Sequence, residues 1–283
     1  MKSQWKAAAL VLVSGIAYAD DESIAYGIAK FGGAGQCGNP DQTHNEHTKS
    51  AAAFDLVFTT QRIFGNWDEN HQRPNSDAQG RFFEDTSKQA SGADRLANFG
   101  ADDVDVIYVH THGGHSVSPA YSSLLMGNAS YDCSVRTDQD MLFGNAGGDL
   151  DIAVIKACQS ADYDTWLNGG YRQQFTSSSS TFTMWNGFHG DSSCGSFVSD
   201  YVADYAAASM NNGVGENWLD EAYAWGFFDD DCPASIVMGS SKAARDNMYE
   251  WGGFRDRKNT GAKTGSSYYY VSGCNPDNGR KLP

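Results

Sequence analysis

Three short apolar runs, rich in β-branched residues, lie in the middle and second half of the chain. They cover residues 104–109, 150–155 and 180–185. A nearly continuous apolar run of this length is typical of a strand buried on both faces of a parallel sheet. Each run gives way to polar and glycine residues, at 110–115, 156–160 and 186–190. We therefore expect an open α/β sheet whose ligands bind beyond the carboxyl ends of these strands.

Weaker patterns predict the elements around this sheet. Helical spacing of apolar residues predicts helices over 47–64, 84–99, 197–210 and 216–225. The second of these helices would place Leu96 and Phe99 on one face. Shorter apolar runs predict strands over 23–31, 236–239 and 268–271, the last at an edge, and the polar segment 66–80 is expected to form a loop. Because no internal repeat or domain linker interrupts the pattern, we expect one domain over residues 20–283.

The first 19 residues have the features of a secretory signal peptide. Lys2 and Lys6 supply a positive start, and residues 7–16 form an apolar stretch. Ala17-Tyr18-Ala19 then matches the small-x-small cleavage pattern. The apolar stretch is too short to span a bilayer. We therefore predict a secreted or periplasmic protein.

Composition narrows the classes of partner. The 283 residues include 20 Lys and Arg against 35 Asp and Glu, a formal net charge of −15. Nucleic acids and anionic membranes attract clustered basic residues, so this balance argues against both. The 40% hydrophobic content is too high for a disordered chain. We expect a globular monomer that acts on a peptide or protein.

The six cysteines allow two interpretations. All of them follow the signal peptide: Cys37, Cys133, Cys158, Cys194, Cys232 and Cys274. In an oxidising compartment six cysteines favour three disulfides, whose pairing the sequence does not fix. If one cysteine is instead a catalytic thiol, five are left, which gives two disulfides and an odd cysteine. The even count weighs against the catalytic alternative.

Two of the predicted strands end in residues that suit nucleophilic catalysis. His112 and Gly113 follow the first strand, and Ala157 and Cys158 follow the second. A thiol becomes an acyl-transfer nucleophile when a nearby imidazole helps to form the thiolate, and backbone N–H groups stabilise the oxyanion that develops. If the two strands are parallel neighbours, these residues emerge at the same edge of the sheet. Gly113 would then let the backbone approach a substrate closely.

In these residues the sequence resembles the caspase-like cysteine peptidases, which include caspases, metacaspases, gingipains, clostripain and legumain. That superfamily has one apolar strand ending in His-Gly and a later one ending in Ala-Cys, roughly 50 residues apart in caspases. The resemblance covers about residues 100–200. It implies a three-layer α/β sandwich with a mostly parallel central sheet flanked by helices. It also implies a cysteine endopeptidase with Cys158 as nucleophile, His112 as general base, and the N–H groups of Gly113 and Cys158 as the oxyanion hole.

The sequence also departs from the caspase pattern. Lys156 stands where caspases have Gln, and Gln159-Ser160 replaces Arg-Gly after the cysteine. The arrangement is more similar to an exported bacterial branch, in which an aromatic-acidic segment, here 82–85, precedes the His-Gly strand. In that branch a Gly-Phe-His strand end, here 187–189, follows the cysteine.

The resemblance also suggests residues that bind substrate. His189 is expected either to line the site or to cap a loop. Acidic pocket residues select a basic side chain before the scissile bond in this superfamily, and the candidates here are Asp162, Asp164 and Asp191. No organic cofactor is implied. Calcium is left open, although we interpret the acidic run 229–231 as a solvated turn rather than a calcium site.

Two other classes of function compete with the peptidase. His110, His112 and His115 have the spacing of the three histidines in the metallo-β-lactamase pattern His-x-His-x-Asp-His, which would predict a zinc hydrolase. Gly114 replaces the Asp of that pattern, and the Ala-Cys strand end would be unexplained. The third class is an inactive binding domain on the same scaffold. Its exposed aromatic residues would be Trp166, Trp185 and Trp225, although core packing is the usual role of such residues.

Overall fold

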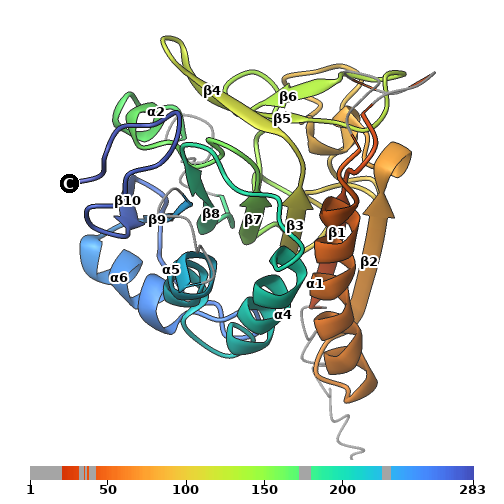
Figure 1. Ribbon diagram of the computed structural model, residues 1–283. Helices are drawn as coiled ribbons and strands as arrows, with labels where there is room; N and C mark the ends of the chain where they lie inside the picture. The colour runs from red at the N-terminus through yellow and green to blue at the C-terminus, as the bar shows by residue number, and fades with distance from the viewer. Residues whose placement is uncertain (1–20, 32–34, 36, 38–42, 172–179, 225–230) are drawn as a thin grey trace, which may run out of the picture.

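A mostly parallel sheet forms the centre of the molecule. The computed structural model describes residues 21–31, 35, 37, 43–171, 180–224 and 231–283. Its central sheet has seven strands in the order β10-β9-β8-β7-β3-β1-β2 (Figure 1). These are β1 (Glu22–Gly27), β2 (Glu69–Pro74), β3 (Val106–His110), β7 (Ile152–Lys156), β8 (Met184–His189), β9 (Cys232–Gly239) and β10 (Gly265–Tyr270). The five neighbouring strands at one side of the sheet, β2, β1, β3, β7 and β8, run parallel to one another. The strand β9 pairs in antiparallel fashion with β8 and with β10. The predicted mixed α/β class is confirmed.

Helices cover one face of this sheet. They are α1 (Asn45–Ile63), α4 (Val198–Ala208) and α5 (Val214–Ala224), with α6 (Lys242–Trp251) beside β9 and β10 (Figure 1). Phe54 of α1 stacks on Tyr108 of β3 with ring centroids 4.9 Å apart, and Trp218 of α5 meets Phe188 of β8 at 5.2 Å. All four side chains are fully buried, so large aromatic residues form the core between helices and sheet.

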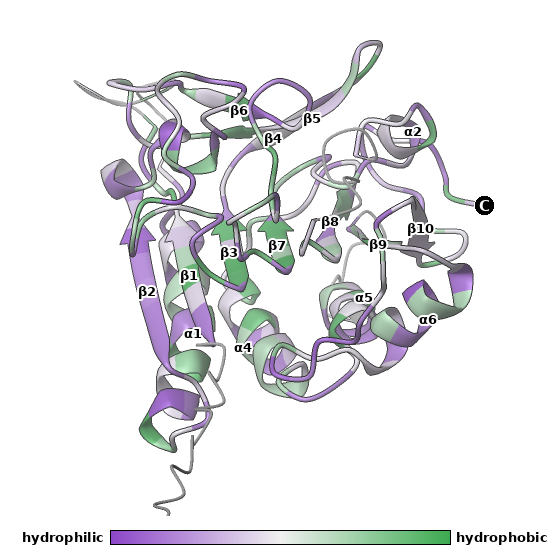
Figure 2. Cartoon of the chain, turned by 180° about the vertical axis from the view of Figure 1, so that it is seen from behind, coloured by the Kyte–Doolittle hydropathy of each residue, from purple (hydrophilic) through white to green (hydrophobic). Residues whose placement is uncertain are grey.

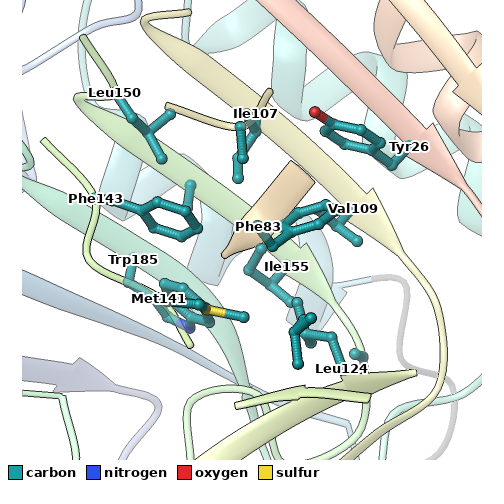
Figure 3. Close-up of a cluster of buried hydrophobic side chains, with 14 of the residues drawn as sticks. Tyr26, Phe83, Ile107, Val109, Leu124, Met141, Phe143, Leu150, Ile155 and Trp185 are labelled. Carbon is teal, nitrogen blue, oxygen red and sulfur yellow. The ribbon is translucent and has the colours of Figure 1, made fainter. Parts of the chain in front are cut away.

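The opposite face is covered differently from the expected helical layer. Ile107, Val109 and Ile155 of the sheet pack against Phe83, which ends a short helix, and Met141, which lies in an irregular segment (Figure 3). Short helices contribute here as well: η1 (Asn75–Asp77), η2 (Gly80–Phe83) and α2 (Tyr163–Leu167). Figure 2 views the molecule from this side and shows the hydrophobic strands β3 and β7 behind these segments. In the described part of the chain, helices therefore flank the sheet mainly on one face.

A second, antiparallel sheet stands at the carboxyl ends of β3 and β7 (Figure 1). It consists of β4 (Gly113–Val117), β5 (Ala120–Leu125) and β6 (Ser134–Arg136). This second sheet was not predicted from the sequence. Its polar strands, half-buried for the most part, carry only a weak hydrophobic signal. This sheet nevertheless borders the residues that follow β3, among which a catalytic residue was expected.

Two predicted segments differ from the structure. Residues 66–80 contain β2, a strand at the edge of the sheet whose half-buried positions are polar enough to suggest a loop. Residues 84–99 form turns and no helix, and Leu96 and Phe99 are exposed. The Asp85 carboxylate accepts the backbone N–H of Ser87 at 2.7 Å, a local hydrogen bond that competes with helix formation.

The third predicted strand is displaced along the chain. β8 covers Met184–His189 instead of 180–185, so His189 is its last residue rather than part of a following loop. The other predicted helices and strands are found within a few residues of their expected bounds. Among the described residues, no helix combines the length and the apolar character needed to cross a membrane.

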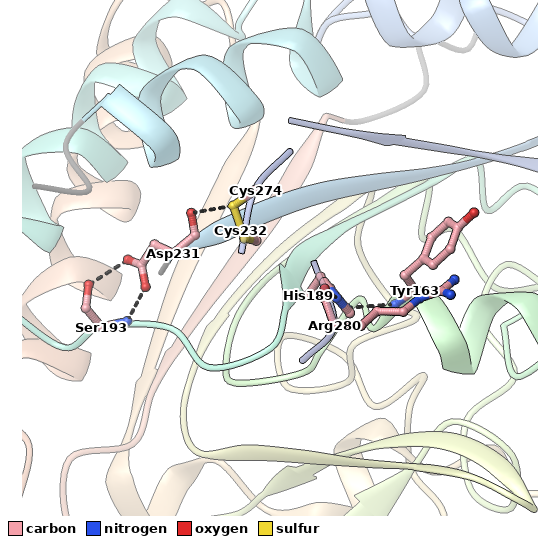
Figure 4. The surroundings of a disulfide bond; sticks show 7 residues. All are labelled: Tyr163, His189, Ser193, Asp231, Cys232, Cys274 and Arg280. Atoms are coloured by element: carbon pink, nitrogen blue, oxygen red, sulfur yellow. Dashed lines mark hydrogen bonds between the residues drawn. A yellow bond between two sulfur atoms is a disulfide. The ribbon is translucent and has the colours of Figure 1, made fainter. Parts of the chain in front are cut away.

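Two disulfides are present. Cys37 bonds to Cys133, and Cys232 at the start of β9 bonds to Cys274 after β10 (Figure 4). Cys158 and Cys194 are free thiols. The three-disulfide interpretation is therefore wrong, and the arrangement is the one that leaves Cys158 unpaired, with Cys194 as the odd cysteine.

Candidate active site

The sheet brings the two candidate motifs together. β3 and β7 are parallel neighbours, and His110 at the end of β3 is opposite Lys156 at the end of β7. Gly113 then lies directly on the backbone of Cys158, because a Cβ atom at Gly113 would be 2.2 Å from the Cys158 carbonyl oxygen. No side chain fits in that space, so glycine is required here by close approach rather than by backbone conformation.

Cys158 lies in a half-buried position that solvent can reach. The backbone N–H of Ser192, from the loop after β8, donates to its Sγ at 3.4 Å. The thiol in turn lies 3.8 Å from the Ser192 carbonyl oxygen, to which it donates. An N–H donor directed at sulfur stabilises a thiolate more than a thiol. Ser192 is not predictable as a site residue, since nothing in its local sequence pattern distinguishes it from other loop serines.

His112 is half-buried beside Cys158's strand. Burial lowers its pKa, and the neighbouring His44 lowers it further, so the imidazole is neutral and able to accept a proton at neutral pH. Its ring packs against Phe31 and His44 with centroids 4.6 and 4.8 Å away. Among the described residues nothing pairs with its buried Nε2 atom, and no hydrogen bond joins it to Cys158. The two residues therefore lie at one edge of the sheet without a hydrogen bond between them.

Lys156 anchors the loop that contacts the thiol. Its side chain is fully buried, and its Nζ donates to the Ser193 carbonyl at 2.7 Å and lies over the ring of Phe188. Asp231 accepts hydrogen bonds from both the backbone and the hydroxyl of Ser193 at 2.6 Å (Figure 4). The carboxylate of Asp231 is thus used in the interior, which disfavours it as a calcium ligand. Residues 229 and 230 lie outside the described part of the chain.

His189 holds two segments together instead of facing solvent. It is fully buried, and its Nε2 donates to the Arg280 carbonyl at 2.8 Å (Figure 4). Its Nδ1 lies 2.9 Å from Asp162 Oδ2 and 3.1 Å from the backbone nitrogen of Tyr163. His189 was expected either to line the site or to cap a loop. Its ring binds both the chain near the C-terminus and the start of α2, and these contacts match the second role.

The three acidic substrate candidates already have partners. Asp162 is buried and caps α2; burial raises its pKa, but hydrogen bonds from His189 and the Thr165 N–H outweigh this effect and hold the pKa below its usual value. Asp164 forms a 3.0 Å ion pair with Arg280. Asp191 accepts a hydrogen bond from the side chain of Asn278. Asp164 and Asp191 thus bind residues of the C-terminal segment, and Asp162 is linked to that segment through His189.

The predicted zinc triad is not brought together. His115 on β4 points to Asp162, with its Nε2 3.8 Å from Oδ1, and His112 packs on Phe31. His110 instead meets His47 of α1 and Cys194. Burial is the main cause that lowers the pKa of His47 to about 3 and that of His110 well below its usual value, so both rings are neutral.

The tryptophans offer no aromatic platform in the described residues. Trp185 is fully buried, and its Nε1 donates to the Ser160 carbonyl. Trp166 is partly buried and donates to Ser266 at 3.0 Å. Trp225 lies outside the described residues. Core packing therefore accounts for the two that the structure describes.

Comparison with known proteins gives no relative to reason from: no family model matches the chain, and no curated protein matches it.

Proposed function

We propose that this protein is an exported, caspase-like cysteine peptidase that hydrolyses peptide bonds through Cys158 and His112. The observation that carries the proposal is the close approach of Gly113 to the backbone of a free, solvent-accessible Cys158. This contact joins the ends of two parallel, buried strands, where ligands bind in open α/β sheets. The two disulfides support export, because such bonds persist in oxidising compartments.

The reaction follows from the groups at this edge. His112 accepts the proton of Cys158, and the thiolate attacks the carbonyl carbon of the scissile peptide bond. The N–H groups of Gly113 and Cys158 stabilise the resulting oxyanion. His112 then gives the proton to the leaving amine as the C–N bond breaks, which leaves a thioester on Cys158. Water hydrolyses the thioester to release the acid product and the free thiol. The Ser192 N–H stabilises the charge on sulfur once the thiolate has formed.

The proposal requires His112 to move within reach of sulfur. A general base needs to come within hydrogen-bond distance of the proton that it takes, although such contacts often form only when substrate is bound. The unpartnered Nε2 of His112 loses no existing hydrogen bond in doing so. His112 is therefore a base whose proton-accepting atom is free.

Thiol labelling combined with peptide cleavage tests this function. Iodoacetamide labelling of the intact protein, followed by peptide mass spectrometry, gives separate rates for Cys158 and Cys194. We expect Cys158 to react faster than an ordinary thiol and at least about 10-fold more slowly in His112→Ala, since general acid–base partners contribute factors of this order or more. Cleavage of a mixed peptide library should disappear in Cys158→Ala. His115→Ala, which alters a neighbouring histidine that points to Asp162, serves as the matched control.

Two results would overturn the proposal. Peptide cleavage that survives Cys158→Ala would assign the activity to another group. Ordinary reactivity of Cys158 together with no cleavage of any library peptide would favour a binding domain on this scaffold.

A further inference from the structure

Three side chains from separate parts of the fold direct ligand atoms at one point. His47 lies in α1, His110 ends β3, and Cys194 belongs to the loop between β8 and α4. Cys194 Sγ is 3.4 Å from His47 Nε2 and 3.9 Å from His110 Nε2, and the three atoms all lie within 4.8 Å of one another. A tetrahedral zinc ion, with bonds of about 2.0 Å to nitrogen and 2.3 Å to sulfur, spaces its ligand atoms about 3.3–3.7 Å apart.

The surrounding hydrogen bonds fix which nitrogen of His47 carries the proton. His47 Nδ1 lies 2.6 Å from the Ile28 carbonyl oxygen. A carbonyl can only accept, so Nδ1 carries the hydrogen. In the neutral ring, Nε2 then has a lone pair, and this lone pair faces Cys194.

Ser50 binds the second nitrogen of His110. The Ser50 hydroxyl lies 2.6 Å from His110 Nδ1 and 3.1 Å from the His47 carbonyl oxygen, and it accepts the hydroxyl of Tyr108 at 3.1 Å. When the single Ser50 proton goes to the His47 carbonyl, the ring Nδ1–H of His110 donates to Ser50, and the lone pair of His110 Nε2 also faces Cys194. Metal-bound histidines show this arrangement, in which the second ring N–H is held by a carbonyl or another acceptor.

In that tautomer of His110, the cluster has too few protons when no cation is bound. Two buried imidazole lone pairs face one thiol, and the thiol has a single, weakly donating proton. One of the two nitrogen atoms is thus left without a donor, at the cost of an unsatisfied buried polar group. A metal ion bound to two imidazoles and a thiolate satisfies all three atoms at once.

We propose that His47, His110 and Cys194 bind a zinc ion. Imidazole and thiolate together favour this borderline-soft cation, and three protein ligands leave a fourth tetrahedral position for water. Binding releases the Cys194 proton to solvent as the metal–sulfur bond forms. Cys194 is exposed, which gives an ion a path from solvent to the two buried rings. This site shares only His110 with the triad expected from the sequence.

The ion would also order the loop beside Cys158. Cys194 is two residues from Ser192, whose N–H donates to the Cys158 sulfur. Zinc at Cys194 therefore ties that loop to α1 and β3. The inference does not rest on peptidase activity, because none of the three ligands belongs to the proposed dyad.

Cobalt binding to the full mature protein tests the site. The protein is first dialysed against a chelator and then titrated with Co²⁺, which reports thiolate ligation by a near-ultraviolet charge-transfer band. We expect one ion per chain, with the band displaced by Zn²⁺. Cys194→Ser, a change at an exposed loop residue, should abolish the band. Cys158→Ser is the matched control and should keep it while removing any peptide cleavage. Ser50→Ala should weaken binding by about 10-fold, as expected for the loss of a residue that orients a ligand.

The same cobalt experiment can also contradict the zinc site. Absence of stoichiometric binding, a band that persists in Cys194→Ser, or a band that disappears in Cys158→Ser would each overturn the zinc site. Circular dichroism of each variant separates loss of binding from loss of folding. Since the Cys158→Ser protein should bind cobalt without cleaving peptides, failure of the zinc site and failure of the peptidase proposal give different results.

Discussion

Gly113 determines how closely the ends of β3 and β7 can approach. Its missing side chain leaves space that the Cys158 carbonyl occupies, whereas the adjacent Gly114 has only the Ser123 hydroxyl within reach of a Cβ atom, at 3.4 Å. A side chain is therefore excluded at Gly113, whereas a methyl group can be accommodated at Gly114. The difference makes a matched pair of variants possible.

We expect Gly113→Ala to be destabilising and Gly114→Ala to be nearly neutral. The new methyl group in Gly113→Ala would meet backbone at 2.2 Å, and overpacking of this kind costs about 1–3 kcal/mol. The shift of the strand ends should also slow the labelling of Cys158. Urea denaturation and iodoacetamide kinetics on both variants measure the two effects. Equal stability of the two variants would contradict the close approach.

Single residues also show how far the sequence predicts the site. His112, Gly113 and Cys158 could be found because each follows a strongly apolar strand. Lys156 and Ser192 could not be assigned, because their partners lie far away in the sequence. A site role for His47 could not be predicted from the sequence either. The local pattern places it in a predicted helix, and only the fold brings that helix, α1, against the end of β3.

At the scale of elements, burial decides which parts of the fold are predictable. β3 and β7 are fully buried, so their apolar runs identify them without ambiguity. β2 is half-buried at an edge and looks like a loop, as its hydrophilic colour in Figure 2 shows. The segment 84–99 has helical spacing, but its acidic side chains bind backbone and neighbouring loops instead. Long-range contacts thus override the local pattern at the periphery of the sheet.

The two disulfides close loops of different length. Cys37 follows β1 and Cys133 precedes β6, so their bond closes a loop with a sequence separation of 96 residues. We expect Cys37→Ala/Cys133→Ala to lose about 4–5 kcal/mol of stability, since loop-closure entropy grows with loop length. The Cys232–Cys274 pair, separated by 42 residues, should contribute slightly less. Urea denaturation of metal-free protein gives both values, with Cys194→Ser as the control for removing an unpaired thiol. A loss below 1 kcal/mol for the longer loop would contradict the expectation.

At the scale of the whole molecule, acidic residues outnumber basic ones, and some of the acidic side chains lie in the interior. The net charge is −15, and several carboxyl groups are buried in the irregular layer that covers one face of the sheet. Burial is the main cause that raises the pKa of Glu84 and Asp94 to about 7 and that of Asp102 to about 8. For Asp102, burial outweighs the hydrogen bond from the Gly144 N–H and the nearby Arg95 guanidinium, 3.6 Å away.

These raised pKa values predict that stability falls as pH rises from about 4 to about 8. A carboxyl group whose pKa is higher in the folded than in the unfolded chain stabilises the fold fully below the unfolded pKa, near 4, and this contribution is lost as pH rises through the folded pKa. For Asp102 the loss extends to about pH 8. One carboxyl that titrates in this way changes the free energy of unfolding by about 1–3 kcal/mol over two pH units.

Asp102→Asn should therefore reduce the fall in stability between pH 6 and pH 8. Asparagine keeps an acceptor for the Gly144 N–H and carries no charge to desolvate. Asp246→Asn on α6 is the control, because hydrogen bonds from Lys242 and Tyr269 lower the pKa of that half-buried carboxyl, which stays ionised throughout this range. Urea denaturation at pH 6, 7 and 8 measures the slopes. If the wild-type and Asp102→Asn proteins lose stability in parallel, Asp102 is ionised in the folded protein, and the acidic layer owes its stability to Arg95 rather than to protonation.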